Sequence, residues 1–275
     1  MVELGALGFV FVAGLVTALA TGLGALPFFF VAEIPDRWTV VLWGFSSGIM
    51  VAASLFGLVT EGLQAGTDAV AGVPAEATLV IGAVSGAALV VVSHDVLEAT
   101  EVDPKAYEAA DFRKLVLILG VLTVHSFPEG VAVGVSFADL GLDGGLQLLG
   151  LSVPLLAVFM TVAISIHNVP EGTAISIPLR EMGVGEGRMV WWAVFSSLPQ
   201  PIGAVLAFYF VRIARDLLPF GFGFAAGAMV YLVATEFLPE GLAAGADLPG
   251  GGWRELLGGI VAGGLLMLPL AFVQV

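Results

Sequence analysis

Long apolar runs alternate with short polar segments along the whole chain. Each of eight runs approaches or exceeds the roughly 20 residues with which a helix crosses a bilayer. The runs are Gly5–Val31, Trp38–Thr60, Ala77–Leu97, Phe112–Ala138, Leu146–Pro178, Met189–Ile213, Leu217–Leu242 and Glu255–Val273. The polar segments between them are too short to separate domains. The pattern therefore predicts one all-α polytopic membrane domain over residues 1–275, with eight transmembrane helices.

The amino-acid composition supports a membrane protein and argues against a soluble domain. The chain is 59% hydrophobic and 12% charged, with a mean hydropathy of +1.04, whereas soluble domains are about 25% charged. We therefore expect a lipid bilayer around it. The formal net charge is −14, which argues against nucleic acid as a partner, since nucleic acid attracts clustered Lys and Arg. The chain contains no cysteine, so thiolate metal ligands are excluded.

The basic residues are distributed unevenly over the polar segments. If the N-terminus is outside, the outside loops contain only Arg212 and Arg215. The inside loops then contain Arg37, Lys105, Arg113, Lys114, Arg180, Arg188 and Arg254. Because cytoplasmic loops are enriched in Lys and Arg, we expect a multi-pass plasma-membrane protein with both termini outside.

Two related hexapeptides place ionisable side chains inside apolar runs. Residues 125–130 read HSFPEG and residues 167–172 read HNVPEG. In each, a histidine and a glutamate four positions apart lie on one face of a helix. Ionisable groups at membrane depth are costly and usually functional. Two such faces turned toward each other would supply two imidazoles and two carboxylates, enough to bind a divalent cation.

The chemistry of these side chains narrows the choice of ion. Neutral imidazole and carboxylate suit zinc, iron(II) and other first-row divalent ions. The candidate ligands are His125, Glu129, His167 and Glu171. Asn168 and Ser126 can face the same space, three residues before the two glutamates. The alternative is a pair of His–Glu hydrogen bonds that hold two helices together.

Prolines accompany these polar residues. Pro128 and Pro170 each lack an N–H group and should disrupt their helix locally, which at membrane depth is typical of backbone lining an ion site. Gln200 lies between Pro199 and Pro201. This triplet predicts a second helix break and a cavity wall in the sixth run.

Other polar residues in the apolar runs give weaker indications. Glu236 and Glu240 lie one turn apart in the seventh run and could form a second metal site or an exit path. His94 and Asp95 stand near the end of the third run. We interpret them as a solvated helix end, and we keep Asp95 as a candidate residue of the pathway.

The paired motifs, set in eight expected spans, resemble the ZIP family of divalent-metal transporters. The resemblance implies a three-two-three arrangement of helices in which the outer triplets form an inverted repeat. It also implies a primary site made by His125, Glu129, His167 and Glu171, between the fourth and fifth helices. Glu129 and Glu171 would bridge toward a second site that Asn168 shares.

Two positions depart from bacterial members of that family with a two-metal centre. Ser126 stands where asparagine is typical, and Gln200 stands where the sixth helix usually offers a glutamate. Both changes weaken or remove ligands. We therefore expect one strong metal site and a degraded second one.

The sequence thus predicts a carrier, not an enzyme, that moves a divalent metal into the cytoplasm. Zinc is the favoured transported ion, with Fe²⁺, Mn²⁺ and Cd²⁺ as alternatives, and no cofactor is expected. A cation exchanger of another class is disfavoured because calcium prefers all-oxygen sites. An intramembrane metalloenzyme is disfavoured because the chain lacks a His-Glu-x-x-His motif. The oligomeric state stays open, a homodimer included.

Overall fold

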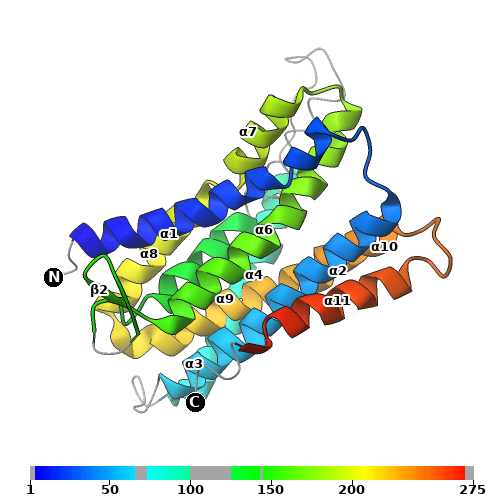
Figure 1. The fold of residues 1–275 in the computed structure, drawn as a ribbon. Coiled ribbons are helices and arrows are strands. Elements are labelled where there is room, and N and C mark those ends of the chain that lie inside the picture. The colour runs from blue at the N-terminus through cyan, green and yellow to red at the C-terminus, as the bar shows by residue number, and fades with distance from the viewer. Residues whose placement is uncertain (1–3, 66–72, 100–124, 143–144, 270–275) are drawn as a thin grey trace.

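The computed structural model describes residues 4–65, 73–99, 125–142 and 145–269, and these are mostly helical (Figure 1). Residues 125–136 are helical and include the first hexapeptide. The other elements are α1 Leu4–Leu23, η1 Leu26–Phe29, α2 Asp36–Ala52, η2 Ala53–Val59, α3 Thr60–Gln64, α4 Ala75–Ala99, β1 Leu146–Leu148, β2 Leu151–Val153, α6 Leu155–Glu181, α7 Glu186–Ser196, α8 Pro199–Ile213, η4 Arg215–Leu217, α9 Leu218–Leu232, η5 Val233–Phe237, α10 Leu238–Ala244 and α11 Trp253–Leu266.

Six helical stretches within the described residues are long and apolar enough to cross a membrane. They are Leu4–Phe29, Asp36–Gln64, Ala75–Val96, Leu155–Glu181, Glu186–Ile213 and Arg215–Ala244. Each overlaps one of the expected runs, so the chain is a helical multi-pass membrane protein. The fourth run lies partly outside the described residues, and the eighth is represented by α11. The count of eight spans stays a prediction.

The outward faces of these helices are apolar. Val80 and Val84 on α4 are 57% and 65% exposed, and Ile202 and Leu206 on α8 are similarly open. Large exposed hydrophobic side chains on successive turns are unfavourable in water but suit contact with lipid tails. These exposed side chains belong to the apolar runs that the sequence shows.

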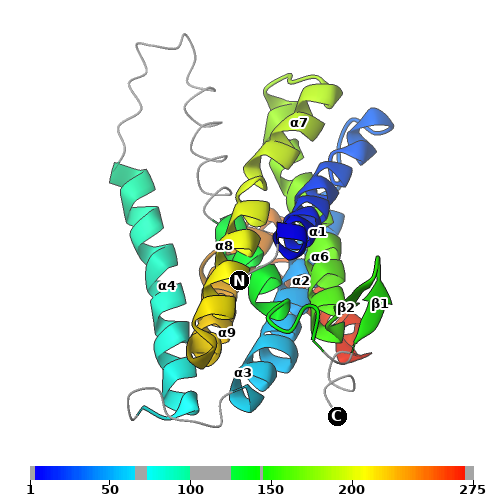
Figure 2. The ribbon, with the colours of Figure 1, turned by 90° about the vertical axis from the view of Figure 1, so that its left-hand side faces the viewer.

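Glycines allow two pairs of helices to pack with their backbones in close contact. A Cβ at Gly82 or Gly86 of α4 would collide with carbonyl oxygens of α9. A Cβ at Gly44 or Gly48 of α2 would collide in the same way with α11. In lipid, such small-residue contacts are a main source of helix association. Figure 1 shows α2 beside α11, and Figure 2 shows α4 at one edge of the bundle, where it packs against α9.

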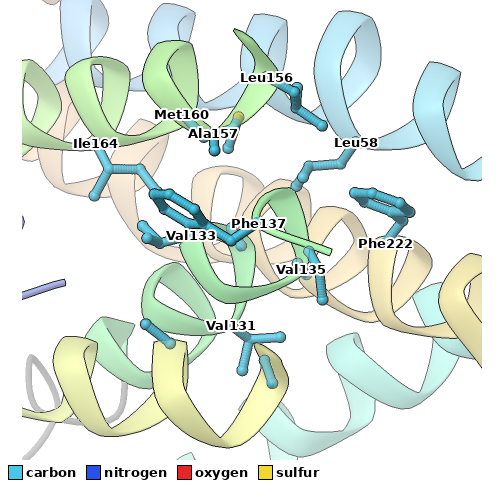
Figure 3. Packing of buried hydrophobic residues seen from close by; sticks show 14 of the residues in the cluster. Leu58, Val131, Val133, Val135, Phe137, Leu156, Ala157, Met160, Ile164 and Phe222 are labelled. Carbon is cyan, nitrogen blue, oxygen red and sulfur yellow. The ribbon is translucent and has the colours of Figure 1, made fainter. Parts of the chain in front are cut away.

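The described part of the fourth run lies inside the largest buried cluster. Val131, Val133 and Val135 contribute to it, and the chain then turns at Phe137 into the same cluster (Figure 3). Met160 of α6 and Phe222 of α9 pack around them. The helix that carries the first hexapeptide is therefore surrounded by other helices, which isolates its polar residues from lipid.

The expected span Leu146–Pro178 begins later than its apolar run, and this prediction was wrong over the first residues. β1 and β2 form an antiparallel hairpin there, and α6 starts at Leu155. Leu149 and Gly150 have φ of 50° and 81°, as tight hairpin turns require. Pro154 is extended, with ψ of 138°, so the helix cannot extend back through it. Hydrophobicity alone does not distinguish these short strands from a helix.

The prolines act differently at the predicted breaks. The sixth run is interrupted as expected, because α7 ends at Ser196 and α8 begins at Pro199. The disruption expected at Pro128 and Pro170 does not end either helix, since residues 125–136 stay helical and α6 continues to Glu181. Membrane helices tolerate proline when neighbouring helices and hydroxyl groups hydrogen-bond to the backbone beside it. Ser46 Oγ donates such a bond to the carbonyl of His167, at 3.0 Å.

Candidate metal-binding site

Helix-to-helix contacts bring the two hexapeptides together at the centre of the bundle. Glu129 comes from the helical segment 125–136, and His167 and Glu171 come from α6. The side chains of these three residues are essentially inaccessible to solvent. The sequence spacing puts His167 and Glu171 on one face of α6, and tertiary packing adds Glu129 from the facing helix.

The glycine that ends each hexapeptide has a structural role in this packing. A Cβ on Gly130 would collide with the backbone of Gln200 on α8. A Cβ on Gly172 would collide with the carbonyl oxygen of Thr21 on α1. The two motif glycines therefore let α8 and α1 approach closely beside the polar residues.

Glu129, His167 and Glu171 form what we call the central cluster. One potential ligand atom of each lies within 4.8 Å of the other two. His167 Nε2 is 3.2 Å from Glu129 Oε1 and 3.9 Å from Glu171 Oε2. Neither carboxylate oxygen of Glu171 has a hydrogen-bond partner among the described residues. A buried carboxylate without a partner is costly, and a divalent cation would remove that cost.

Ser46 fixes the orientation of His167. Its hydroxyl donates to the His167 carbonyl at 3.0 Å and lies 2.8 Å from Nδ1. A hydroxyl that donates its only proton to the carbonyl can only accept from Nδ1–H. Nε2 is then the unprotonated nitrogen and faces Glu129 Oε1 at 3.2 Å, so that a cation between the two atoms could use its lone pair. Orienting the ring in this way is the usual effect of an outer hydrogen bond on a liganding histidine.

An amide chain runs beside the central cluster. Gln200 Nε2 donates to Glu129 Oε2 at 2.6 Å, and Asn168 Nδ2 donates to Gln200 Oε1 at 3.0 Å. Asn168 Nδ2 also donates to the carbonyl of Thr17 at 2.7 Å. Gln200 thus uses both ends of its amide to join two residues that were predicted as ligands.

A second cluster contains His94 of α4, His125 of the segment 125–136 and Glu236 of η5. His94 Nε2 is 2.8 Å from Glu236 Oε1, and His125 Nε2 is 2.6 Å from Glu236 Oε2. One ligand atom of each residue lies within 4.8 Å of the others. The cluster is therefore compact enough to hold a single metal ion.

The close approaches in the second cluster lack hydrogen-bond geometry. His94 Nε2, Glu236 Oε1 and both ring nitrogens of His125 have no hydrogen-bond partner among the described residues. His125 is buried, while the side chains of His94 and Glu236 are 28% and 14% exposed. Charged and polar atoms that converge this closely without a hydrogen bond are expected of ligands around a cation.

Comparisons with known proteins agree with this geometry. The family model described as ZIP zinc transporter matches residues 93–271, well over half of the chain. The chain is 31% identical over 265 residues to the zinc transporter GufA of Myxococcus xanthus, covering 94% of this chain and 96% of GufA. The chain belongs to the ZIP zinc transporter family.

Two other relatives carry similar names. The zinc transporter ZIPB of Bordetella bronchiseptica is 34% identical over 236 residues, covering 85% of this chain and 72% of ZIPB. A putative zinc transporter of Arabidopsis thaliana is 40% identical over 228 residues, which is 82% of this chain but only 33% of that protein. These relatives are named as transporters, not as enzymes.

The structure divides the predicted ligands of this ZIP-family chain between two places. Glu129, His167 and Glu171 lie together, whereas His125, expected beside them, lies with Glu236 in the second cluster. Ser126 is buried next to His125. Asp95 and Glu240 are exposed and belong to neither cluster.

His94 is the residue of the two clusters that sequence reasoning did not propose as a ligand. It was expected at a solvated helix end, but α4 continues past it to Ala99 and its imidazole meets Glu236. One signal in the sequence could have found it. The chain contains only three histidines, and the other two already lie in the paired motifs.

Proposed function

We propose that this protein carries a divalent metal ion, zinc foremost, across a membrane. The observation that carries the proposal is the central cluster, an imidazole and two carboxylates fully buried among membrane-spanning helices. The names of its relatives as zinc transporters support the choice of zinc. Fe²⁺, Mn²⁺ and Cd²⁺ suit the same donors and are competing substrates in this proposal.

The donor set fits a transported ion. Glu129 and Glu171 together neutralise the charge of a dication, which offsets much of the cost of moving it out of water. Three protein ligands leave one tetrahedral position for water, whereas structural zinc sites close all four. An open coordination position allows water or a new protein ligand to replace the old ligands one at a time. The metal can then leave the site without losing all of its ligands at once.

The second cluster lies along the expected path. His125 and Glu129 are one turn apart on the same helix, about 6 Å along its axis, so the two clusters are neighbours. Partial exposure of His94 and Glu236 gives the second cluster access to solvent. In our proposal the ion moves between the clusters toward the cytoplasm, through eight spans arranged three-two-three with both termini outside the plasma membrane.

We propose further that the central cluster holds one metal and not two. Gln200 is engaged at both ends of its amide, because Nε2 donates to Glu129 Oε2 and Oε1 accepts from Asn168 Nδ2. Asn168 Oδ1 has no hydrogen-bond partner among the described residues, so the loss of the second site is assigned to Gln200 and not to Asn168. An amide nitrogen that donates to Glu129 occupies the direction in which a second cation would bind that carboxylate. This supports the expected degraded second site beside a strong first one.

Zinc influx into proteoliposomes containing a zinc-sensitive dye tests the function, with His167→Ala alongside. We expect influx by the parent protein and its loss in the variant, because the variant removes the only imidazole of the central cluster. Excess calcium should compete poorly. Influx that survives in folded His167→Ala, or calcium that outcompetes zinc, would contradict the proposal.

A further inference from the structure

Among the described residues, Phe237 is the one whose aromatic ring contacts a histidine of each cluster. It lies at the end of η5, directly after the cluster residue Glu236, and is 1% exposed. Its ring stacks on the imidazole of His167, with centroids 5.4 Å apart and planes 20° apart. It also lies 6.3 Å from the ring of His125. One aromatic ring thus contacts both ligand sets.

The π-helical turn explains how consecutive residues reach two different clusters. The turn η5 spans Val233–Phe237, and such π-bulges widen a helix locally and occur frequently at functional sites. Glu236 contributes its carboxylate to the second cluster, and Phe237 turns its ring toward the central one. Trp43 of α2 packs edge-on against the same ring at 5.0 Å, which limits its freedom.

The ring has two physical consequences for an ion. It offers no lone pair to a metal, so it places an apolar face against one histidine of each cluster. Its face also restrains the imidazole plane of His167, whose edge is already held by Ser46. Aromatic stacking of this kind stabilises one orientation of the imidazole and so affects how precisely Nε2 is placed.

We propose that Phe237 is a positioning residue of the transport path. It orients His167 for metal binding in the central cluster, and its ring separates this cluster from the second one, so that transfer between them requires the ring to move. This inference rests on the proposed transport function. It predicts that changes to the Phe237 side chain affect zinc affinity and the rate of transfer between the clusters in different ways.

Zinc influx measured as a function of zinc concentration separates these two roles. Phe237→Leu removes the flat face and part of the apolar surface, so we expect KM to rise about tenfold, as for loss of an outer partner of a ligand, while the maximal rate does not fall. Phe237→Trp keeps an aromatic face and enlarges the apolar surface. We expect a KM near that of the parent protein and a maximal rate lowered severalfold.

Phe222→Leu is the matched control. Phe222 lies in the same membrane span, is 2% exposed and belongs to the same buried apolar cluster as Phe237, but the described residues show no ring contact between it and a histidine. It should lower the amount of folded protein without raising KM. If Phe237→Leu is not recovered folded, Phe237→Met, which is unbranched and adaptable, tests the same prediction, with zinc affinity titrated in detergent.

The outcomes distinguish this inference from the proposed function. Phe237 variants that change KM and maximal rate no more than Phe222→Leu would overturn the role of Phe237 and leave transport intact. A lowered maximal rate at unchanged KM in Phe237→Leu would also overturn it, because that result indicates damage to the fold alone. Absence of zinc influx in the folded parent protein would overturn both proposals.

Discussion

The central and second clusters contain the same kinds of ligand but are built differently. In the central cluster all three residues are buried, and hydrogen bonds from Ser46 and Gln200 hold His167 and Glu129. In the second cluster the ring nitrogens of His125 have no hydrogen-bond partner among the described residues, and His94 is 28% exposed. Two of the three central ligands are therefore held before a metal arrives, whereas Glu171 and the imidazole of His125 have no hydrogen-bond partner among the described residues.

This difference indicates how a carrier can both select and release an ion. Ligands held by outer hydrogen bonds lose little freedom on binding, which favours affinity. Ligands without such support bind less tightly and exchange more readily with water. We therefore expect the central cluster to determine affinity and the second cluster to affect mainly the rate of passage. Substitutions in matched pairs test this comparison.

The largest effect should come from Glu171→Gln. The change keeps the shape of the side chain but removes one of the two negative charges that compensate the ion. Loss of an outer hydrogen-bond partner of a ligand can lower metal affinity by about 100-fold. We expect Glu171→Gln, which changes a ligand itself, to lower zinc affinity by more than this and to abolish influx. Zinc titration of the purified protein measures the affinity. Glu240→Gln, at an exposed position on α10, is the control and should bind zinc like the parent.

A smaller effect should follow from Ser46→Ala. Without the hydroxyl, Nδ1 of His167 loses its partner and the imidazole can change tautomer or rotate, so zinc affinity should fall about tenfold. The neighbouring Ser47→Ala is the control, because the one side-chain hydrogen bond of Ser47 among the described residues goes to the carbonyl of Trp43 on its own helix. Equal affinities in the two variants would show that Ser46 does not orient His167.

The smallest effect should come from His94→Ala. The second cluster loses one partly exposed ligand while the central cluster is untouched. We expect equilibrium zinc affinity of the central cluster to stay at the parent value, and the influx rate to fall by less than about tenfold. Asp95→Ala, which removes the exposed neighbouring side chain, should leave both values unchanged. A loss of affinity as large as that in Glu171→Gln would mean that the two clusters form one site.

Much of the central cluster could be predicted because it depends on local spacing. His167 and Glu171 share a face of α6 through helical periodicity alone, and both hexapeptides repeat the pattern. The position of His125 could not be predicted in this way. It also lies one turn from a glutamate, yet it joins Glu236 from a distant span, because the helix is surrounded on several sides and each face meets different neighbours.

The places where the fold differs from the sequence-based expectation have a similar cause. The apolar run from Leu146 begins as a hairpin, since Pro154 and the turn at Leu149 and Gly150 determine the backbone there. Helices continue through Pro128 and Pro170, where packing outweighs one missing hydrogen bond. Composition and length predict that a segment enters the membrane, but not how its backbone is supported by its neighbours.

The sequence by itself determined that this is a helical membrane protein, that paired histidine and glutamate residues lie within its spans, and that their chemistry suits a divalent metal. These properties depend on hydrophobicity and on residues within one helical turn. The tertiary structure decided which ligands meet, that His94 is among them, that Gln200 and Ser46 hold the central cluster, and that Phe237 contacts both clusters. These contacts join residues far apart in the chain, and only the packing of whole helices determines their distances.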